Sequence, residues 1–101
     1  MDAVTGTIPR RAGMKVHKIE IYESYADAVL SGEKTFEICY NNRGYQKGDR
    51  LKFEVLGDGS LLRVSHGLNE KEYEITYVHS GIGMERECVA LAIRAVKEVG
   101  E

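Results

Sequence analysis

The sequence predicts an α+β domain, a small and mostly antiparallel β-barrel with one N-terminal helix packed on it. Three observations lead there. A length of 101 residues fits one domain. Helical spacing of apolar residues occurs once, near the N-terminus. After Gly32 the apolar period changes to two, in short runs separated by Gly, Asn and Asp turns. We expect the domain at 14–96, between flexible tails at 1–13 and 97–101.

The first elements follow from local spacing. Alternation of Ile19 and Ile21 with polar residues predicts a strand over 15–21. The helix is expected over 22–32, with Ser24 and Asp27 as a capping box and Gly32 as a left-handed stop. Its residues spaced for one face are Tyr22, Tyr25, Ala26, Val29 and Leu30.

Strands are then expected at 35–40, 50–56, 61–64, 72–78 and 88–93, with a loop at 65–71. In the first of these, alternation puts Phe36 and Ile38 toward the core and Thr35, Glu37 and Cys39 on the opposite face. In the strand over 72–78, Tyr73, Ile75 and Tyr77 share one face. The last strand is apolar throughout, which predicts a central position in the sheet.

Composition excludes several classes of function. Fourteen Lys and Arg against sixteen Asp and Glu give a net charge of −2, which excludes coating of nucleic acid by bulk charge. No apolar run approaches the ~20 residues of a membrane span, and the N-terminus lacks the apolar region of a signal peptide. We therefore expect a cytoplasmic protein without a membrane partner.

Cysteine and histidine spacing predicts neither a metal site nor a cofactor. Cys39 and Cys88 have no CxxC neighbours, and both lie in apolar runs typical of buried free thiols. The three histidines, His17, His66 and His79, lack metal-ligand spacing. His17, on the first strand, is the one that could face a pocket.

The segment from Ser31 to Asp49 carries the candidate chemistry. Within 34–50 there are four cations and two anions, interleaved with Tyr40 and Tyr45. Cations with aromatic rings near a sheet edge can hold a phosphate and stack a base, although a solvated strand and turn has the same composition. Lys34 near Glu37 is either an acid/base pair or an inert ion pair.

The same segment resembles a known family. Ser31-Gly32-x-Lys34-Thr35-Phe36-Glu37-Ile38, followed by Asn41-x-Arg43-x-Tyr45-x-x-Gly48-Asp49, is similar to the DUF3850 group of the ASCH and PUA-like superfamily, found in bacteria and phages. Weaker matches run from His17 to Ile93. The resemblance implies a PUA-like β-barrel that binds RNA or a nucleotide-like ligand in a cleft beside the G-x-K-T segment.

Carried over residue by residue, the resemblance implies a defined ligand site. Lys34 and Arg43 would contact phosphate, and Tyr45 or Tyr40 would stack a base. Glu37 and Asn41 would bond to a base edge. The implied ligand-binding residues are Lys34, Thr35, Glu37, Asn41, Arg43 and Tyr45.

Three departures from the pattern and two alternative functions accompany this expectation. Some members of the wider class are amidohydrolases that deacetylate N4-acetylcytidine, with a Lys at the position of Lys34 and a Thr where this chain has Glu37. The alternative function is therefore an amidohydrolase of a modified nucleoside with Lys34 and Glu37 as its acid/base pair. The group also usually has Arg at Cys39 and Asp at Asn42.

A third alternative is a protein-interaction module. Residues 51–101 carry six Lys and Arg against nine Asp and Glu, an acidic balance that favours it modestly over nucleic-acid binding.

Overall fold

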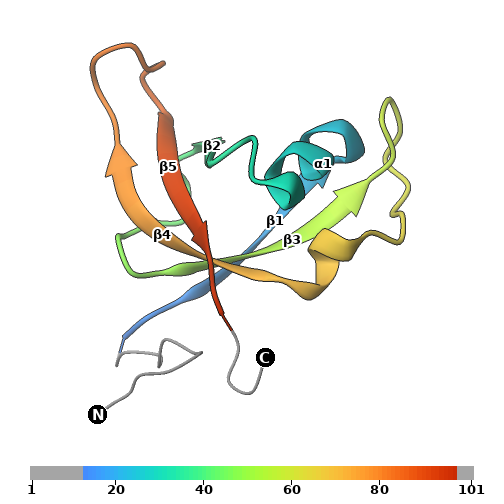
Figure 1. Cartoon of the computed structure of the whole chain (residues 1–101). Coiled ribbons are helices and arrows are strands. Elements are labelled where there is room, and N and C mark those ends of the chain that lie inside the picture. Colours follow the sequence, from blue (N-terminus) through green and yellow to red (C-terminus); the bar gives the residue numbers. More distant parts are fainter. Residues whose placement is uncertain (1–12, 98–101) are drawn as a thin grey trace.

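The computed structural model describes residues 13–97, in which five strands and one α-helix form the predicted α+β unit (Figure 1). Both predicted tails, apart from residues 13 and 97, lie outside the described residues. The elements are β1 (Val16–Tyr22), α1 (Glu23–Ser31), β2 (Phe36–Tyr40), β3 (Arg50–Leu56), the 3₁₀-helix η1 (Gly67–Glu70), β4 (Glu72–His79) and β5 (Cys88–Ala95).

The five strands form one curled sheet in the order β1-β3-β4-β5-β2. The β1–β3 pair is parallel and the other three pairs are antiparallel. The sheet is thus a mixed, mostly antiparallel half-barrel with β1 and β2 at its edges (Figure 1). β5 lies between β4 and β2, which confirms the prediction of an interior strand.

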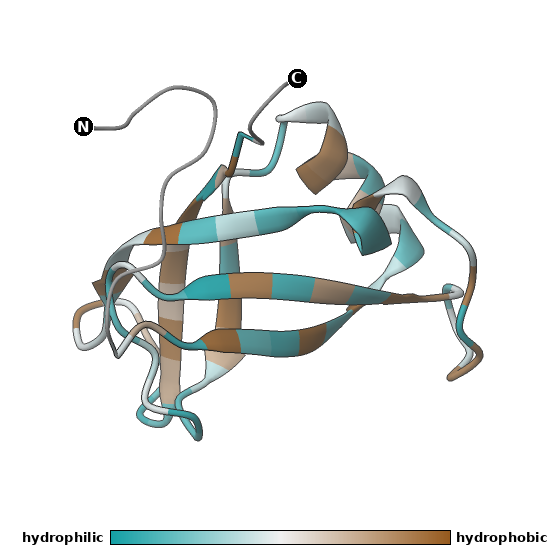
Figure 2. Cartoon of the chain, turned by 90° about the horizontal axis from the view of Figure 1, so that it is seen from below, coloured by the Kyte–Doolittle hydropathy of each residue, from teal (hydrophilic) through white to brown (hydrophobic). Residues whose placement is uncertain are grey.

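The core fills the concave face of this sheet. Along β1, buried and exposed residues alternate, and the buried ones face buried register partners on β3. Figure 2 shows this alternation of hydrophobic and hydrophilic residues along the strands. The inward strand residues are His17, Ile19, Ile21, Leu51, Phe53, Val55, Tyr73, Ile75, Val89, Leu91 and Ile93.

The helix α1 packs against β1, β3 and η1 through a narrow face. Ala26 and Val29 are buried in it, whereas Tyr22, Tyr25 and Leu30 are exposed, so the predicted apolar face is only partly covered. The helix ends at Gly32 as predicted, with a φ of 88° and its N–H donating to the carbonyl of Val29.

The predicted capping box is wrong, because the helix is capped from a distant loop. The Asp58 carboxylate accepts from the backbone N–H of Ser24 at 3.0 Å and from its hydroxyl at 3.2 Å. Asp27 instead pairs with the His66 ring at 2.7 Å. The turn after β3 brings Asp58 to the helix start, a placement that sequence spacing does not encode.

The segment after β3 also differs from expectation. Residues 61–64 form no strand and contribute one bridge, between Leu56 and Arg63. The loop predicted at 65–71 contains η1, which the fully buried Leu68 holds against the core.

A bulge in β4 overturns the predicted face of that strand. The register with β5 shifts between Ile75 and Tyr77, so Thr76 is an extra residue and the period of two is interrupted. Tyr73 and Ile75 remain in the core, but Tyr77 is exposed on the outer face.

The orientation predicted for β2 is wrong as well. Ile38 is 57% exposed and Phe36 is also exposed, whereas Glu37 is only 9% exposed. Glu37 lies opposite the fully buried Leu91 on β5, and residues opposite each other in an antiparallel pair point to the same face. The concave face therefore holds Glu37, and three apolar side chains of β2 point outward.

Candidate functional site

Because Glu37 points inward, its carboxylate forms an ion pair with Lys34. The Lys34 ammonium bonds to the Glu37 carboxylate and donates to the carbonyl of Phe36 at 2.8 Å. The backbone of Lys34 is fixed by its N–H, which donates to Ala28 of α1 at 2.9 Å. Both side chains are mostly buried, so this donor and acceptor are held side by side where β2 begins.

Two aromatic rings flank the Lys34 ammonium. Its Nζ lies 4.8 Å from the ring centroid of Phe36 and 5.6 Å from that of Tyr25. Both distances fall within the range of cation–π attraction. Lys34 is thereby held between the helix and the edge strand.

Cys39 lies two residues beyond Glu37, and its pKa is affected by four neighbours. These neighbours, which with Cys39 form the cluster around Cys39, are Glu37, Tyr45, Lys34 and Arg43. Burial raises the pKa of the Cys39 thiol, and the Glu37 carboxylate raises it further. The hydrogen bond from Tyr45 and the charges of Lys34 and Arg43 lower this pKa without reversing the shift. The thiol is therefore neutral near neutral pH and is not an activated nucleophile.

Tyr45 is a structural member of the cluster. It is only 7% exposed, and its ring centroid lies 4.6 Å from that of His17. Burial, followed by the neighbouring Cys39, raises the pKa of its phenol. Tyr45 offers no open ring face to a base, whereas Tyr40 is 67% exposed on the outer face of β2.

A buried His17–Asp49 pair supports this side of the cluster. The His17 Nε2 lies 2.8 Å from the Asp49 carboxylate, which also accepts from the backbone N–H groups of Lys15 and Gln46. Burial alone would raise the pKa of Asp49, but these hydrogen bonds lower it below its usual value. Sequence periodicity placed His17 on the first strand but could not identify its partner 32 residues away.

The remaining predicted residues lie along the rim. The Arg43 guanidinium donates to the carbonyl of Lys18 on β1, so the segment after β2 spans the gap between the two sheet edges. Thr35 and Asn41 are exposed at opposite ends of β2, about 20 Å apart along an extended strand. The structure thus gathers Lys34, Glu37, Arg43 and Tyr45, and one base does not reach both Thr35 and Asn41.

Sequence reasoning missed an aromatic platform on the outer face of the sheet. Phe36 and Tyr77 lie on either side of Ala92, their common register neighbour on β5. Ile38 and Tyr40 extend the exposed apolar surface along β2. Exposed apolar patches of this kind commonly mark binding surfaces. We call Phe36, Ile38, Tyr40 and Tyr77 the aromatic platform.

In the part of the chain that the structure describes, no three His, Cys, Asp or Glu side chains gather in a way that would hold a metal ion. Between residues 13 and 97, no helix has the length and apolarity to cross a membrane.

A family model covers most of the chain. The model of a protein family described as a domain of unknown function (DUF3850) matches residues 16–93, from the first residue of β1 into β5. The matched range contains the whole cluster around Cys39 and the aromatic platform. No curated protein matches the chain.

Proposed function

Because the chain belongs to the DUF3850 family, whose description assigns no activity, we propose its function from the chemistry of the site. It is an ASCH- and PUA-like module that binds single-stranded RNA or a nucleotide-like ligand at the edge strand β2. The proposal puts the ligand beside the Gly32-x-Lys34-Thr35 segment. The gathering of Lys34, Glu37 and Arg43 around Cys39 is the observation that carries the proposal.

The Glu37 carboxylate suits the edge of a nucleobase. Sequence-specific RNA recognition targets unstacked bases through hydrogen bonds to their Watson–Crick edges. Lys34 holds this carboxylate in place, and the carboxylate accepts from the amino group of a base edge. With two of its N–H groups on Glu37 and the Phe36 carbonyl, Lys34 keeps one donor for a phosphate. The Arg43 guanidinium uses one donor on Lys18 and keeps others for a phosphate.

Stacking is assigned to the aromatic platform rather than to Tyr45. Phe36 and Tyr40 expose their rings on the outer side of the strand that carries Glu37 inside. Four residues of extended strand put these rings about 13 Å apart. Base–aromatic stacking of this kind contributes about 1–3 kcal/mol per base.

Fluorescence anisotropy with labelled single-stranded RNA oligomers tests the proposal. Two phosphate contacts, by Lys34 and Arg43, weaken binding about sevenfold between 50 and 200 mM salt, from a slope of ~0.7 per contact. In Lys34→Ala the salt dependence falls to about 2.6-fold over the same interval. Absence of saturable binding at low salt would overturn the proposal.

The matched control is Lys71→Ala. Lys71 is an exposed lysine that follows η1, and its removal changes the net charge as Lys34→Ala does. This variant keeps the affinity and salt dependence of the wild type. Equal weakening by both variants would mean that binding depends on overall charge and not on this site.

Amide hydrolysis at the same ion pair is a second candidate, favoured by the contact between Lys34 and Glu37 in a mostly buried position. For N4-acetylcytidine, Glu37 takes a proton from a water molecule while the oxygen of that water attacks the acetyl carbonyl. Lys34 stabilises the developing oxyanion. The C–N bond then breaks, the amine leaves with that proton, and the products are cytidine and acetate.

Incubation with N4-acetylcytidine and chromatography for cytidine test this reaction. Glu37→Gln keeps the shape of the side chain and removes the base, so we expect turnover to fall about 10²–10⁴-fold. Turnover that persists in both Lys34→Ala and Glu37→Gln would exclude this pair, and no turnover by the wild type would exclude the reaction.

A further inference from the structure

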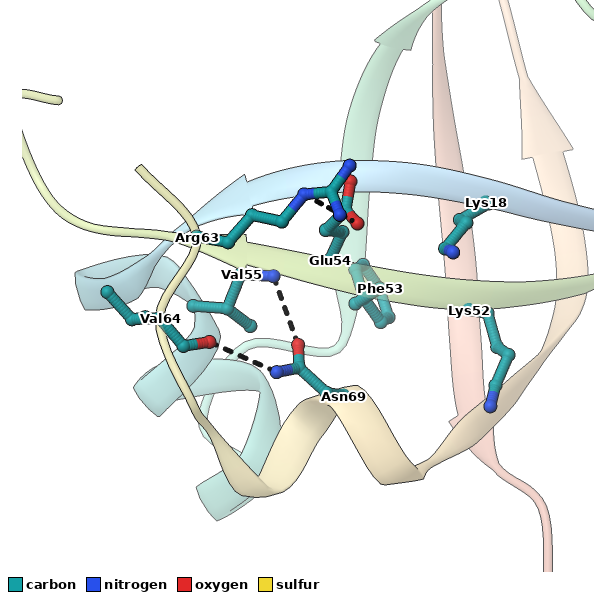
Figure 3. A pocket seen from close by; sticks show the side chains of 8 residues that line it. All are labelled: Lys18, Lys52, Phe53, Glu54, Val55, Arg63, Val64 and Asn69. Atoms are coloured by element: carbon teal, nitrogen blue, oxygen red, sulfur yellow. Dashed lines mark hydrogen bonds and ion pairs between the residues drawn. The ribbon is translucent and has the colours of Figure 1, made fainter. Parts of the chain in front are cut away.

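A groove of about 250 Å³ is lined by residues of β1, β3, η1 and the loop after β3, where the pairing of β3 with β4 ends. The β3–β4 pairing covers only Arg50 to Lys52, and beyond it Asn69 of η1 takes the place of a strand. The Asn69 side chain accepts from the N–H of Val55 at 3.0 Å and donates to the carbonyl of Val64 at 3.1 Å (Figure 3).

The rim of this groove is cationic. Its charged side chains come from outward positions of β1 and β3 and from the loop after β3: Lys18, Lys52, Glu54 and Arg63. Arg63 is bonded to Glu54 at 3.0 Å, which neutralises the one carboxylate of the lining. Figure 3 shows Arg63 extended toward Glu54 and the two lysines on neighbouring strands beyond it. Lys18 and Lys52 are then left without a carboxylate partner among the lining residues.

The two lysines are direct neighbours. Lys18 and Lys52 are register partners in the parallel β1–β3 pair, and strands in a sheet are about 4.8 Å apart. Like charges directly opposite each other destabilise a sheet. Within residues 13–97, neither ammonium takes part in a hydrogen bond or an ion pair. Flexible lysine stems allow both ammonium groups to converge on one anion.

We propose that this groove binds a phosphate group, with Lys18 and Lys52 as its ligands and Arg63 as a third donor. A phosphate dianion neutralises both lysines, relieves their repulsion and fits the volume of the groove. The acidic neighbour Glu20, opposite Glu54 on the same outer face, limits the site to the end where the lysines lie. This site adjoins the cluster around Cys39 at β1, where Arg43 bonds to the Lys18 carbonyl, but it uses the Lys18 ammonium and involves neither Lys34 nor Glu37.

Titration of the ¹⁵N-labelled protein with inorganic pyrophosphate, followed by amide chemical shifts, tests the site. We expect saturable shifts at residues 18, 52 and 63, and a rise in melting temperature with pyrophosphate concentration. Lys18→Gln and Lys52→Gln each weaken binding about tenfold, a factor that corresponds to 1.4 kcal/mol. The double variant abolishes it, and Lys71→Gln, the matched surface control, leaves it unchanged.

The variants also separate loss of binding from loss of folding. Each single substitution removes the lysine repulsion, so without pyrophosphate its melting temperature equals or exceeds that of the wild type. A double variant that binds as tightly as the wild type would overturn the proposal, as would shifts centred on Lys34 and Glu37. A parallel titration with a short single-stranded RNA shows whether a nucleic-acid phosphate or a free phosphate occupies the groove.

Discussion

The inverted orientation of β2 can be tested by one substitution made at two positions, Ile38→Thr and Ile75→Thr. Both residues lie on strands, and threonine retains the β-branched shape that strands favour. Ile38 is 57% exposed on β2, whereas Ile75 is fully buried on β4. The difference between the two free energies of unfolding therefore reports which face of β2 points inward.

The magnitudes follow from burial. Burying a whole isoleucine side chain contributes about 1.5–3 kcal/mol. Less than half of Ile38 is buried, and threonine keeps part of its carbon, so Ile38→Thr costs below about 1 kcal/mol. At Ile75 the shortening costs about 0.5–1.5 kcal/mol. Its new buried hydroxyl without a partner adds about 1–3 kcal/mol. We expect about 1.5–4.5 kcal/mol in all.

Urea denaturation followed by far-ultraviolet circular dichroism measures both values. For a domain of this size, each kcal/mol corresponds to roughly 4–8 °C in melting temperature. Should Ile75→Thr fail to fold, Ile75→Val and Ile38→Val provide the same comparison. Ile75→Val lowers the free energy of unfolding by about 0.5–1.5 kcal/mol, whereas Ile38→Val leaves it nearly unchanged. Equal costs at the two positions would show that Ile38 faces the core, and the inward Glu37 on which the site depends would be refuted.

Three further substitutions test the contacts that hold the site. Asp49 has a lowered pKa, so its stabilisation is present above the ordinary aspartate value of about 3.9 and disappears as the pH falls through the lower folded-state value. Asp49→Asn therefore lowers the free energy of unfolding more at pH 6 than at pH 2 in urea titrations. Asp58→Ala removes the helix cap and costs about 0.5–2 kcal/mol in the same assay, and no loss would contradict the cap. Gly32→Ala puts a Cβ at a φ of +88° with open space around it, so backbone strain alone costs about 1–2 kcal/mol, and a neutral result would contradict the left-handed helix end.

Much of the fold was predictable from the sequence because its strands alternate cleanly and its turns contain glycine. The helix, the five strands of the sheet and the interior place of β5 follow from periodicity. The strand over 35–40 was located but inverted, since Thr35, Glu37 and Cys39 alternate with Phe36, Ile38 and Tyr40 and either set is consistent with a period of two. Only the pairing of Glu37 with Leu91 decides between them.

What could not be predicted depends on contacts between residues distant in the sequence. The helix cap by Asp58 and the His17–Asp49 pair each join segments more than 30 residues apart. The bulge at Thr76 has no glycine or proline to mark it. The segment beside Lys34 was singled out from its residues, and its role as a binding site stays a prediction. The burial of Tyr45 and the exposure of Phe36 depend on how the sheet curls.

The place of β2 in the sheet also has a consequence during synthesis on the ribosome. Among residues 13–97, β2 has β5 as its single strand partner, and β5 is the last strand in sequence order within this range. An edge strand with exposed Phe36, Ile38 and Tyr40 is a template for association with other chains while it waits. A nascent chain that stalls before Cys88 lacks β5 and cannot pair β2. Its solubility therefore depends on how quickly β5 emerges from the exit tunnel.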